Sequence, residues 1–237
     1  MSRKVLVSGA SAGIGRAVCE ARLEAGDRVV GLARDFDKFP GRSLEGFDAI
    51  GIDLADLDAL PDRLSGIAAA HPDLDAIVCN AGEPVFGSLE QFSSGRIRRS
   101  LDLNFTSQVL LVRAVLPEFR RRGRGDIVLI GSEAAVKGGR RGSLYCAAKF
   151  ALRGFAQSIR EETAASRIRV CLVNPGMVRT AFHEKLDFRP GAEPGEHLLP
   201  VDVAAAVSFA LDSREGAVVD EIDLSPQKRV IDFGRSD

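Results

Sequence analysis

The sequence predicts an α/β protein, with one doubly wound parallel sheet flanked by helices on both faces, formed by residues 1–237 as a single domain. Short runs rich in Val, Ile and Leu alternate with longer amphipathic helical patterns from end to end. Such alternation needs crossover connections, which make neighbouring strands parallel. The apolar runs are near-continuous, as expected of strands that are covered on both faces. No linker, repeat or low-complexity segment divides the chain.

In the first half of the chain, the apolar runs read as strands that end in small-residue turns. The helix after the first strand is amphipathic and stops at Gly26, a residue type that commonly ends helices. A longer helical pattern follows the small-residue turn "NAG". Strands are expected over residues 4–9, 28–33, 49–54 and 73–82, and helices over 14–26 and 98–119.

The second half continues the same alternation. The stretch "GSLYCAAKFALRGF" lies on a helix that reaches about Ser166, and "RIRVCLVNPG" is a buried strand that ends at a Pro-Gly pair. Strands are expected over residues 125–132, 167–176 and 217–226, and helices over 142–166 and 201–213.

Composition narrows the classes of partner. Lys and Arg total 32 against 33 Asp and Glu, so no global field attracts nucleic acid or an anionic membrane. The basic segment "FRRRGRG" closes a helix, where cations favour the negative end of the helix dipole. The 4 cysteines and 3 histidines are scattered, so neither a disulfide framework nor a metal site is expected. No signal-peptide pattern or apolar run long enough for a membrane span is present, and we expect a cytoplasmic protein.

A glycine-rich turn follows the first strand. "SGASAGIG" places Gly9, Gly13 and Gly15 where the strand meets the first helix. A dinucleotide pyrophosphate needs a tight turn, a close approach without Cβ atoms, and free N–H groups at a helix N-terminus. Three glycines before a helix can also be a plain structural turn, but their position in a βαβ unit favours nucleotide binding.

The spacing Gly-x-x-x-Gly-x-Gly resembles the short-chain dehydrogenase/reductase family, and further motifs of that family follow in order. The resemblance implies a Rossmann-type fold and covers nearly the whole chain. "NAG" (80–82) matches the motif after the fourth strand, and "NPGMVRT" (174–180) matches the Pro-Gly segment beside the nicotinamide. The matching catalytic set is Asn104, Ser132, Tyr145 and Lys149. The implied cofactor-binding residues are Gly9, Ser11, Gly13, Ile14, Gly15, Arg34, Asp53, Leu54, Asn80, Ala81, Gly82, Tyr145, Lys149, Pro175, Gly176, Val178 and Thr180.

The end of the second strand indicates which nicotinamide cofactor binds. An acid there accepts the ribose 2′-hydroxyl of NAD, whereas an arginine suits a 2′-phosphate. The sequence has Ala33 followed by Arg34, a pattern that resembles the NADP-preferring branch of the family. Asp35 could pair with Arg34 or reach the ribose, and Arg34 could simply be solvated. Ala12 stands where the family has a further basic NADP signal. We expect NADP, with NAD possible.

Tyr145 and Lys149 are four residues apart, so they share one face of a helix. A free tyrosine has a pKa near 10, and moving it by roughly three units to neutral pH requires about 4 kcal/mol. A positive charge at about 4 Å in a dielectric near 20 supplies about 4 kcal/mol. The resemblance implies that Tyr145 is the general acid/base, that Ser132 polarises the substrate oxygen, and that Asn104 holds a water of a proton relay. It also implies that Lys149 binds the nicotinamide ribose and lowers the tyrosine pKa. The alternative is a core tyrosine beside a surface lysine.

The sequence is less informative about the substrate. Residues 181–200 match the family's substrate-covering segment, and their Pro/Gly interruptions predict a mobile lid. The cations His183, Lys185 and Arg189, with Arg140 and Arg141 nearby, could attract an anionic substrate or be solvated loop charges. We expect an alcohol or carbonyl as substrate, and the family implies a homodimer or homotetramer. The alternative function is a non-catalytic, NADP-binding, redox-responsive interaction module.

Overall fold

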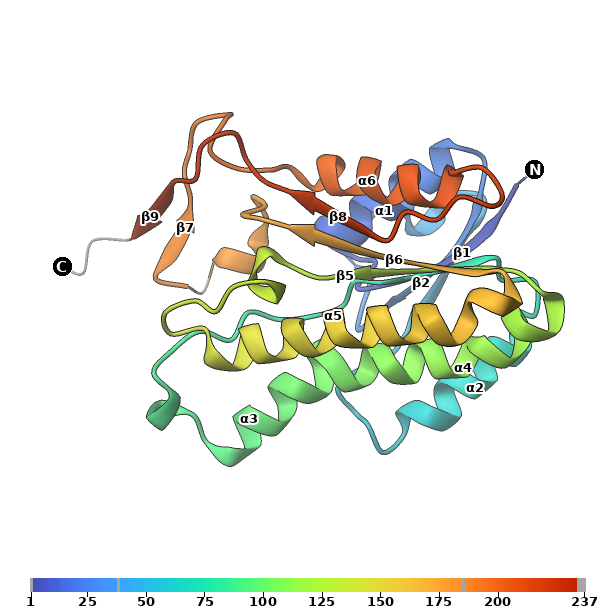
Figure 1. The fold of residues 1–237 in the computed structure, drawn as a ribbon, viewed down its shortest axis with the longest axis horizontal. Helices are drawn as coiled ribbons and strands as arrows, with labels where there is room; N and C mark the ends of the chain where they lie inside the picture. The colour runs from blue at the N-terminus through green and yellow to red at the C-terminus, as the bar shows by residue number, and fades with distance from the viewer. Residues whose placement is uncertain (1, 38, 185, 234–237) are drawn as a thin grey trace.

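The structure, a computed structural model, describes residues 2–37, 39–184 and 186–233. A 7-stranded sheet has the order β3-β2-β1-β4-β5-β6-β8, and every neighbouring pair is parallel (Figure 1). The predicted doubly wound fold is therefore confirmed. The strands are β1 (Lys4–Ser8), β2 (Arg28–Ala33), β3 (Phe47–Gly51), β4 (Ala76–Cys79), β5 (Gly125–Ile130), β6 (Ile168–Pro175) and β8 (Glu221–Leu224).

Helices cover both faces of the sheet (Figure 1). One face carries α1 (Gly13–Glu24) and α6 (Pro200–Asp212). The other carries α2 (Leu60–Ala70), α4 (Ser107–Arg122) and α5 (Ser143–Thr163). The chain also forms α3 (Ser94–Leu101) and the short 3₁₀ turns Pro40–Ser43, Leu89–Gln91, Glu133–Ala135, Ala164–Ser166 and Ala181–His183. None of the helices in the described ranges is long and apolar enough to cross a membrane.

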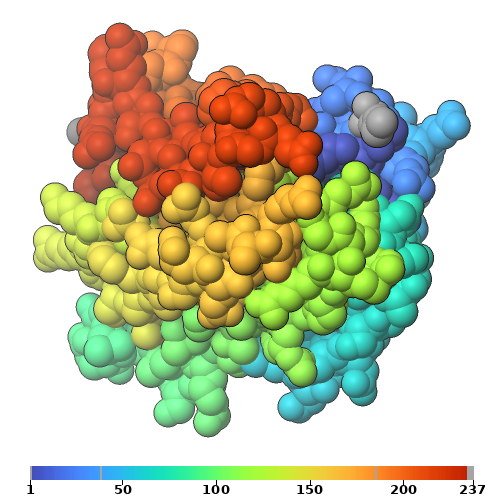
Figure 2. Space-filling model, turned by 45° about the vertical axis from the view of Figure 1, so that its right-hand side comes forward, coloured from blue at the N-terminus to red at the C-terminus, as the bar shows by residue number. Residues whose placement is uncertain are grey.

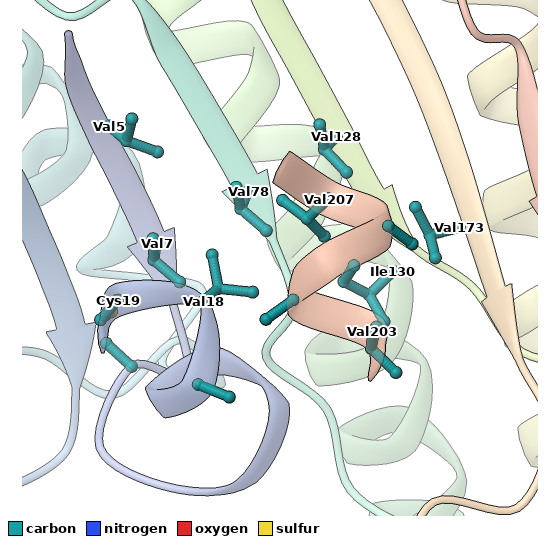
Figure 3. Close-up of a cluster of buried hydrophobic side chains, with 14 of the residues drawn as sticks. Val5, Val7, Val18, Cys19, Val78, Val128, Ile130, Val173, Val203 and Val207 are labelled. Atoms are coloured by element: carbon teal, nitrogen blue, oxygen red, sulfur yellow. The ribbon is translucent and has the colours of Figure 1, made fainter. Parts of the chain in front are cut away.

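The strands alternate their side chains between two apolar layers, as the period of a β-strand requires. On β1, Val5 and Val7 pack with Val18 of α1 and Val207 of α6 (Figure 3). Leu6 points to the opposite layer. Because each layer is filled by helices that the crossovers place there, the carboxyl ends of the strands stay free to form a site.

The helical region around Asn104 differs from its prediction. The sequence predicts one continuous helix over 98–119, but α3 ends at Leu101 and a π-helical turn (Asp102–Thr106) separates it from α4. Helix α2 is not among the elements that the sequence predicts. Single π-turns inside helices are rare and frequently lie at functional sites. The interruption therefore sets Asn104 apart from an ordinary helix residue.

Two short strands form a second, antiparallel sheet beyond the carboxyl ends of β6 and β8 (Figure 1). They are β7 (Phe188–Pro190), inside the predicted lid 181–200, and β9 (Ile231–Phe233), near the C-terminus. The lid is thus tied to a distant segment of the chain. Lys185, one of its predicted cations, lies outside the described residues.

Candidate active site

A cavity of about 1050 Å³ opens at the carboxyl ends of the strands. The strand order reverses between β1 and β4, and such a switch point is where doubly wound sheets bind ligands. With one exception, Gly15, every site residue predicted from the sequence lines this cavity. The structure thus brings together residues from the glycine turn, the "NAG" and "NPGMVRT" segments, and the Tyr145–Lys149 helix.

The glycine turn has the geometry that a pyrophosphate requires. Gly9 and Gly13 have φ of 67° and 56°, a left-handed conformation that other residues adopt at a cost. A Cβ on Gly15 would lie 2.2 Å from the carbonyl oxygen of Gly9, so Gly15 shapes the turn from behind the cavity. Helix α1 begins at Gly13 without a side-chain cap at Ala12. Its first N–H groups are therefore available to an anion.

The turn is fixed by polar groups, two of which, Ser8 and Gln108, the sequence analysis did not single out. The Asn80 Nδ2 donates to the Ser8 carbonyl at 2.9 Å, and the Ser8 hydroxyl accepts from the backbone of Asn80 and Ala81 at 2.9 and 3.0 Å. The Gln108 Nε2 donates to the Ala81 carbonyl at 2.9 Å. The signal in the sequence was a serine inside an apolar strand, since a buried hydroxyl needs a partner.

Arg34 and Asp53 line the part of the cavity that lies beyond the carboxyl ends of β2 and β3. Arg34 and its neighbour Asp35 are exposed, and no ion pair of either occurs among the described residues. Asp53 accepts a hydrogen bond from the backbone of Ala55 at 2.9 Å, and Arg99 lies 3.9 Å from its carboxylate. The Arg34 guanidinium can therefore meet a phosphate without first losing a carboxylate partner.

Tyr145 and Lys149 are both buried on α5, with the ammonium 5.7 Å from the centre of the tyrosine ring. The Lys149 Nζ donates to the Ile130 carbonyl at 2.8 Å, and burial lowers its pKa to about 8. Burial raises the pKa of Tyr145 to about 12, although a hydrogen bond with Ser132 opposes the shift. The net pKa shift of Tyr145 is therefore upward in this structure, because desolvation of the phenolate outweighs the effects that lower the pKa, and the lowering effect of Lys149 stays a prediction.

Asn104 lies in the π-turn, and both the oxygen and the nitrogen of its side-chain amide form hydrogen bonds. Its Oδ1 accepts from the backbone of Glu83 at 3.0 Å, and its Nδ2 donates to the Ser100 carbonyl at 3.0 Å. A Cβ on Gly82 would come 2.7 Å from the same Oδ1. The last glycine of "NAG" is thus needed for the close approach of Asn104, which locks this wall of the cavity.

Aromatic rings surround the side chain of Tyr145 in the cavity. The Tyr145 ring lies 5.2 Å from Phe86 and 5.9 Å from Phe182 between ring centres, and Phe86 lies 5.0 Å from Phe188. Phe86 comes from the loop after β4 and was not predicted from the sequence. Phe182 and Phe188 come from the lid.

The predicted cations near the lid separate into two groups. Arg141 forms an ion pair with Asp187 of the lid, and Arg189 is exposed and does not line the cavity. Arg140, Arg141 and His183 do line it, and burial lowers the pKa of His183. The described residues contain no group of His, Cys, Asp and Glu that could hold a metal ion.

The fold and this cavity first define a class, the doubly wound α/β proteins with a ligand site at the switch point of the sheet. The family is defined by comparison with known proteins. The family model described as short chain dehydrogenase matches residues 3–189. The chain belongs to the short-chain dehydrogenase/reductase family, a family of oxidoreductases.

Several relatives are similar over much of the chain. The NADP-dependent 3-hydroxy acid dehydrogenase of Schizosaccharomyces pombe is 29% identical over 92% of this chain and 90% of its own length. Estradiol 17-beta-dehydrogenase 1 of Rattus norvegicus is 34% identical over 80% of this chain, which spans 58% of that protein. Retinol dehydrogenase 8 of Homo sapiens is 35% identical over 78%, and the chain spans 61% of its length.

Solved structures agree with the fold. A short-chain dehydrogenase from Streptomyces avermitilis superposes with a TM-score of 0.80 at 29% identity, over 94% of this chain and 88% of that one. A putative NAD(P)-dependent gluconate 5-dehydrogenase from Beutenbergia cavernae, solved with bound NADP, superposes with a TM-score of 0.84 at 28% identity. The match covers 94% of this chain and 95% of that one.

Proposed function

We propose that the protein is an NADP(H)-dependent oxidoreductase that transfers a hydride between the nicotinamide and an alcohol or carbonyl substrate, with Tyr145 as general acid/base. One observation carries the proposal. A buried phenol and a buried ammonium, one helical turn apart, share a single cavity with a glycine turn and a free helix N-terminus. Proton transfer beside a bound dinucleotide needs these groups in one place.

The residues present fit NADP. The left-handed turn at Gly9 and Gly13 leads into the uncapped N-terminus of α1, which suits a pyrophosphate, and Arg34 suits a 2′-phosphate. The cofactor named for the Schizosaccharomyces pombe relative and bound in the Beutenbergia cavernae structure is NADP, which supports the choice. NAD is the alternative, because Asp35 could accept the hydrogen of a ribose hydroxyl.

The nicotinamide supplies or accepts the hydride when it is bound. Tyr145, held protonated by burial, donates its proton to the carbonyl oxygen in reduction, and in oxidation its phenolate form removes the proton from the hydroxyl. Ser132 hydrogen-bonds the same oxygen, and Lys149 holds the cofactor ribose. The positive charge of Lys149 favours the phenolate that proton donation leaves behind. Asn104 holds a water of the relay through which the proton exchanges with solvent.

The substrate class is an alcohol or carbonyl with apolar groups beside the reacting carbon, because Phe86 and Phe182 lie against Tyr145. The relatives named for 3-hydroxy acids, estradiol and retinol all have a hydroxyl substrate, which supports this choice. The buried, free cysteines fit a reducing, cytoplasmic location.

The test replaces Tyr145 with Phe, which keeps the ring and removes the proton. NADPH oxidation is followed at the nicotinamide absorbance across a panel of aldehydes and ketones. We expect turnover to fall by at least about 100-fold, while NADPH affinity and the melting temperature stay close to wild type. Near-normal turnover of Tyr145→Phe would overturn the assignment. Tight NADPH binding by the wild type without turnover of any compound would favour the interaction module instead.

A homodimer or homotetramer is part of the proposal. Helices α4 and α5 lie side by side at the surface (Figures 1 and 2), and Phe150 of α5 is 45% exposed. The family resemblance implies assembly through these two long helices, which begin near Asn104 and Tyr145. Light scattering coupled to gel filtration gives the state directly, and a monomer at all concentrations would contradict this part.

A further inference from the structure

The C-terminal segment straps the lid at several points. Strand β9 pairs with β7 in antiparallel register, with Phe188 opposite Phe233. The backbone of Gly191 donates to the Val230 carbonyl at 3.2 Å, and the backbone of Lys228 donates to the Gly195 carbonyl at 2.8 Å. The segment therefore contacts the lid at residues 188–191 and again at Gly195. Figure 1 places this small sheet beside the carboxyl ends of the strands, where the cavity lies.

Strand β9 also forms part of the cavity wall. Ile231 and Phe233 line the cavity, yet their side chains are 47% and 71% exposed. Phe233 lies 6.4 Å from Phe188 between ring centres, and Phe188 connects through Phe86 to the ring of Tyr145. Exposed apolar side chains that line a cavity fit a ligand that covers them. The outer end of this aromatic row therefore fits the apolar part of a substrate whose carbonyl meets Tyr145.

The charges of the cavity are unevenly placed. Arg229, just before β9, lines the cavity, and its contact among the described residues is the Ser225 hydroxyl at 3.4 Å. Arg140 also lines it without an ion pair in the described part of the chain. The carboxylate of Glu133 lies close to Gly176 and near enough to Tyr145 to raise the phenol pKa. An anion beside the reacting carbon therefore meets this carboxylate, whereas an anion beside β9 meets the guanidinium of Arg229.

We propose that β9 is the outer wall of the substrate site and that Arg229 selects substrates with an anionic group remote from the reacting carbonyl. The inference rests on the proposed function, but it concerns a segment that the family match, which ends at residue 189, does not include. The substrate class is an apolar oxo or hydroxy compound whose carboxylate is separated from the reacting carbon by an apolar chain or ring. The guanidinium of Arg229 then forms a charge-assisted hydrogen bond with that carboxylate.

Matched ketones test the proposal. 4-Benzoylbutyrate carries a remote carboxylate, its methyl ester carries none, and benzoylformate carries one on the carbonyl carbon. We expect Arg229→Gln to raise KM for 4-benzoylbutyrate about tenfold and to leave the ester unchanged. We expect wild type to prefer 4-benzoylbutyrate to benzoylformate. Phe233→Ala raises KM for both 4-benzoylbutyrate and its ester.

Two exposed residues outside the cavity are the matched controls, Arg214→Gln and Phe209→Ala, and neither changes KM. Equal effects of Arg229→Gln on acid and ester, or no effect on either, would overturn the proposal.

A binding measurement tests the proposal without turnover. Calorimetry measures the binding of 4-phenylbutyrate and of its amide to the NADPH-bound protein. We expect Arg229→Gln to bind 4-phenylbutyrate more weakly than wild type does, and to bind the amide with unchanged affinity. If the protein shows this binding pattern but turns over no ketone, the proposed oxidoreductase function is rejected and the anion site at Arg229 is retained. If wild type binds the acid and the amide equally well, the anion site itself is rejected.

Discussion

The proposed cofactor end of the cavity, around the glycine turn, and its proposed substrate end, around Tyr145 and the lid, are built in different ways. At the cofactor end the backbone forms the site, through the left-handed Gly9 and Gly13 and the turn packed against Asn80. At the substrate end side chains form it, through aromatic rings and the three-residue strands β7 and β9. A backbone site tolerates little change, because a Cβ cannot move away. A side-chain site can change its residues while its fold persists, which allows one family to use many substrates.

The largest expected effect is at the cofactor end, in Gly15→Ala. The new Cβ would lie 2.2 Å from the Gly9 carbonyl oxygen, so the turn must shift. We expect NADPH affinity to fall at least about 100-fold, since a displaced turn loses its N–H contacts to the pyrophosphate. Isothermal titration with NADPH measures this.

The matched control is Gly66→Ala on α2, where no atom lies within 4 Å of the added Cβ. In a helix interior, alanine is favoured over glycine by roughly 0.5 to 1 kcal/mol. The control therefore keeps NADPH affinity and raises the melting temperature slightly. Equal NADPH affinity in both variants would contradict a backbone-built cofactor end.

The second effect tests Arg34, the side chain that we propose selects NADP over NAD. Replacing Arg34 with Gln removes the guanidinium from an exposed position that has no ion pair among the described residues. We expect the ratio of NADPH to NADH in kcat/KM to fall by about tenfold or more, mainly through KM for NADPH. Steady-state kinetics with each cofactor give the ratio. An unchanged ratio would mean that Arg34 is only solvated.

The third prediction concerns Lys149, which lies where the two ends meet. Burial lowers its pKa from 10.5 to about 8. The unfolded chain therefore binds more protons between about pH 8 and 10.5, and the contribution of Lys149 to the free energy of unfolding rises with pH in that window. Lys149→Met lacks this rise and is more stable at pH 7 by up to about 3 kcal/mol, although it loses turnover.

Urea unfolding of the protein without cofactor, at pH values from 7 to 10, tests this pH dependence. Above pH 10 the raised pKa of Tyr145 acts in the opposite direction, because the folded protein keeps a proton that the unfolded chain releases. Above about pH 9 the raised pKa values of the buried Cys19, Cys79 and Cys171 thiols act in the same direction as Tyr145, so the difference between wild type and Lys149→Met, which share these thiols, isolates Lys149. Parallel curves for wild type and Lys149→Met would contradict a depressed lysine pKa.

The sequence predicts the cofactor end of the cavity better than the substrate end. The parallel sheet and the positions lining the cofactor end were predictable, because strand patterns and glycines express local backbone requirements. Gly15 was placed in the turn correctly, but it supports the turn from behind. Ser8 and Gln108 could have been found only by asking how a polar residue in an apolar strand is satisfied.

The substrate end was predicted less well for a physical reason. Strand β9 is defined by pairing with β7, about forty residues earlier, and three-residue strands have no periodicity to detect. The π-turn at Asn104 reads as ordinary helix, since the apolar spacing continues through it. The direction of the Tyr145 pKa shift depends on burial, which the spacing of Tyr145 and Lys149 does not give.

The smallest expected effect is Asp187→Asn, at the substrate end. Asp187 pairs with Arg141, but both side chains are at least half exposed, and exposed ion pairs contribute about 0 to 1 kcal/mol. The melting temperature and NADPH affinity should therefore stay constant. The freed Arg141 adds a cation to the cavity wall, so KM for 4-benzoylbutyrate falls by about twofold and KM for its ester does not change. High salt should abolish the difference, because partly exposed charges are screened. A loss of fold or of NADPH binding in Asp187→Asn would show that the lid supports the cofactor end, and the division between a backbone-built and a side-chain-built end would fail.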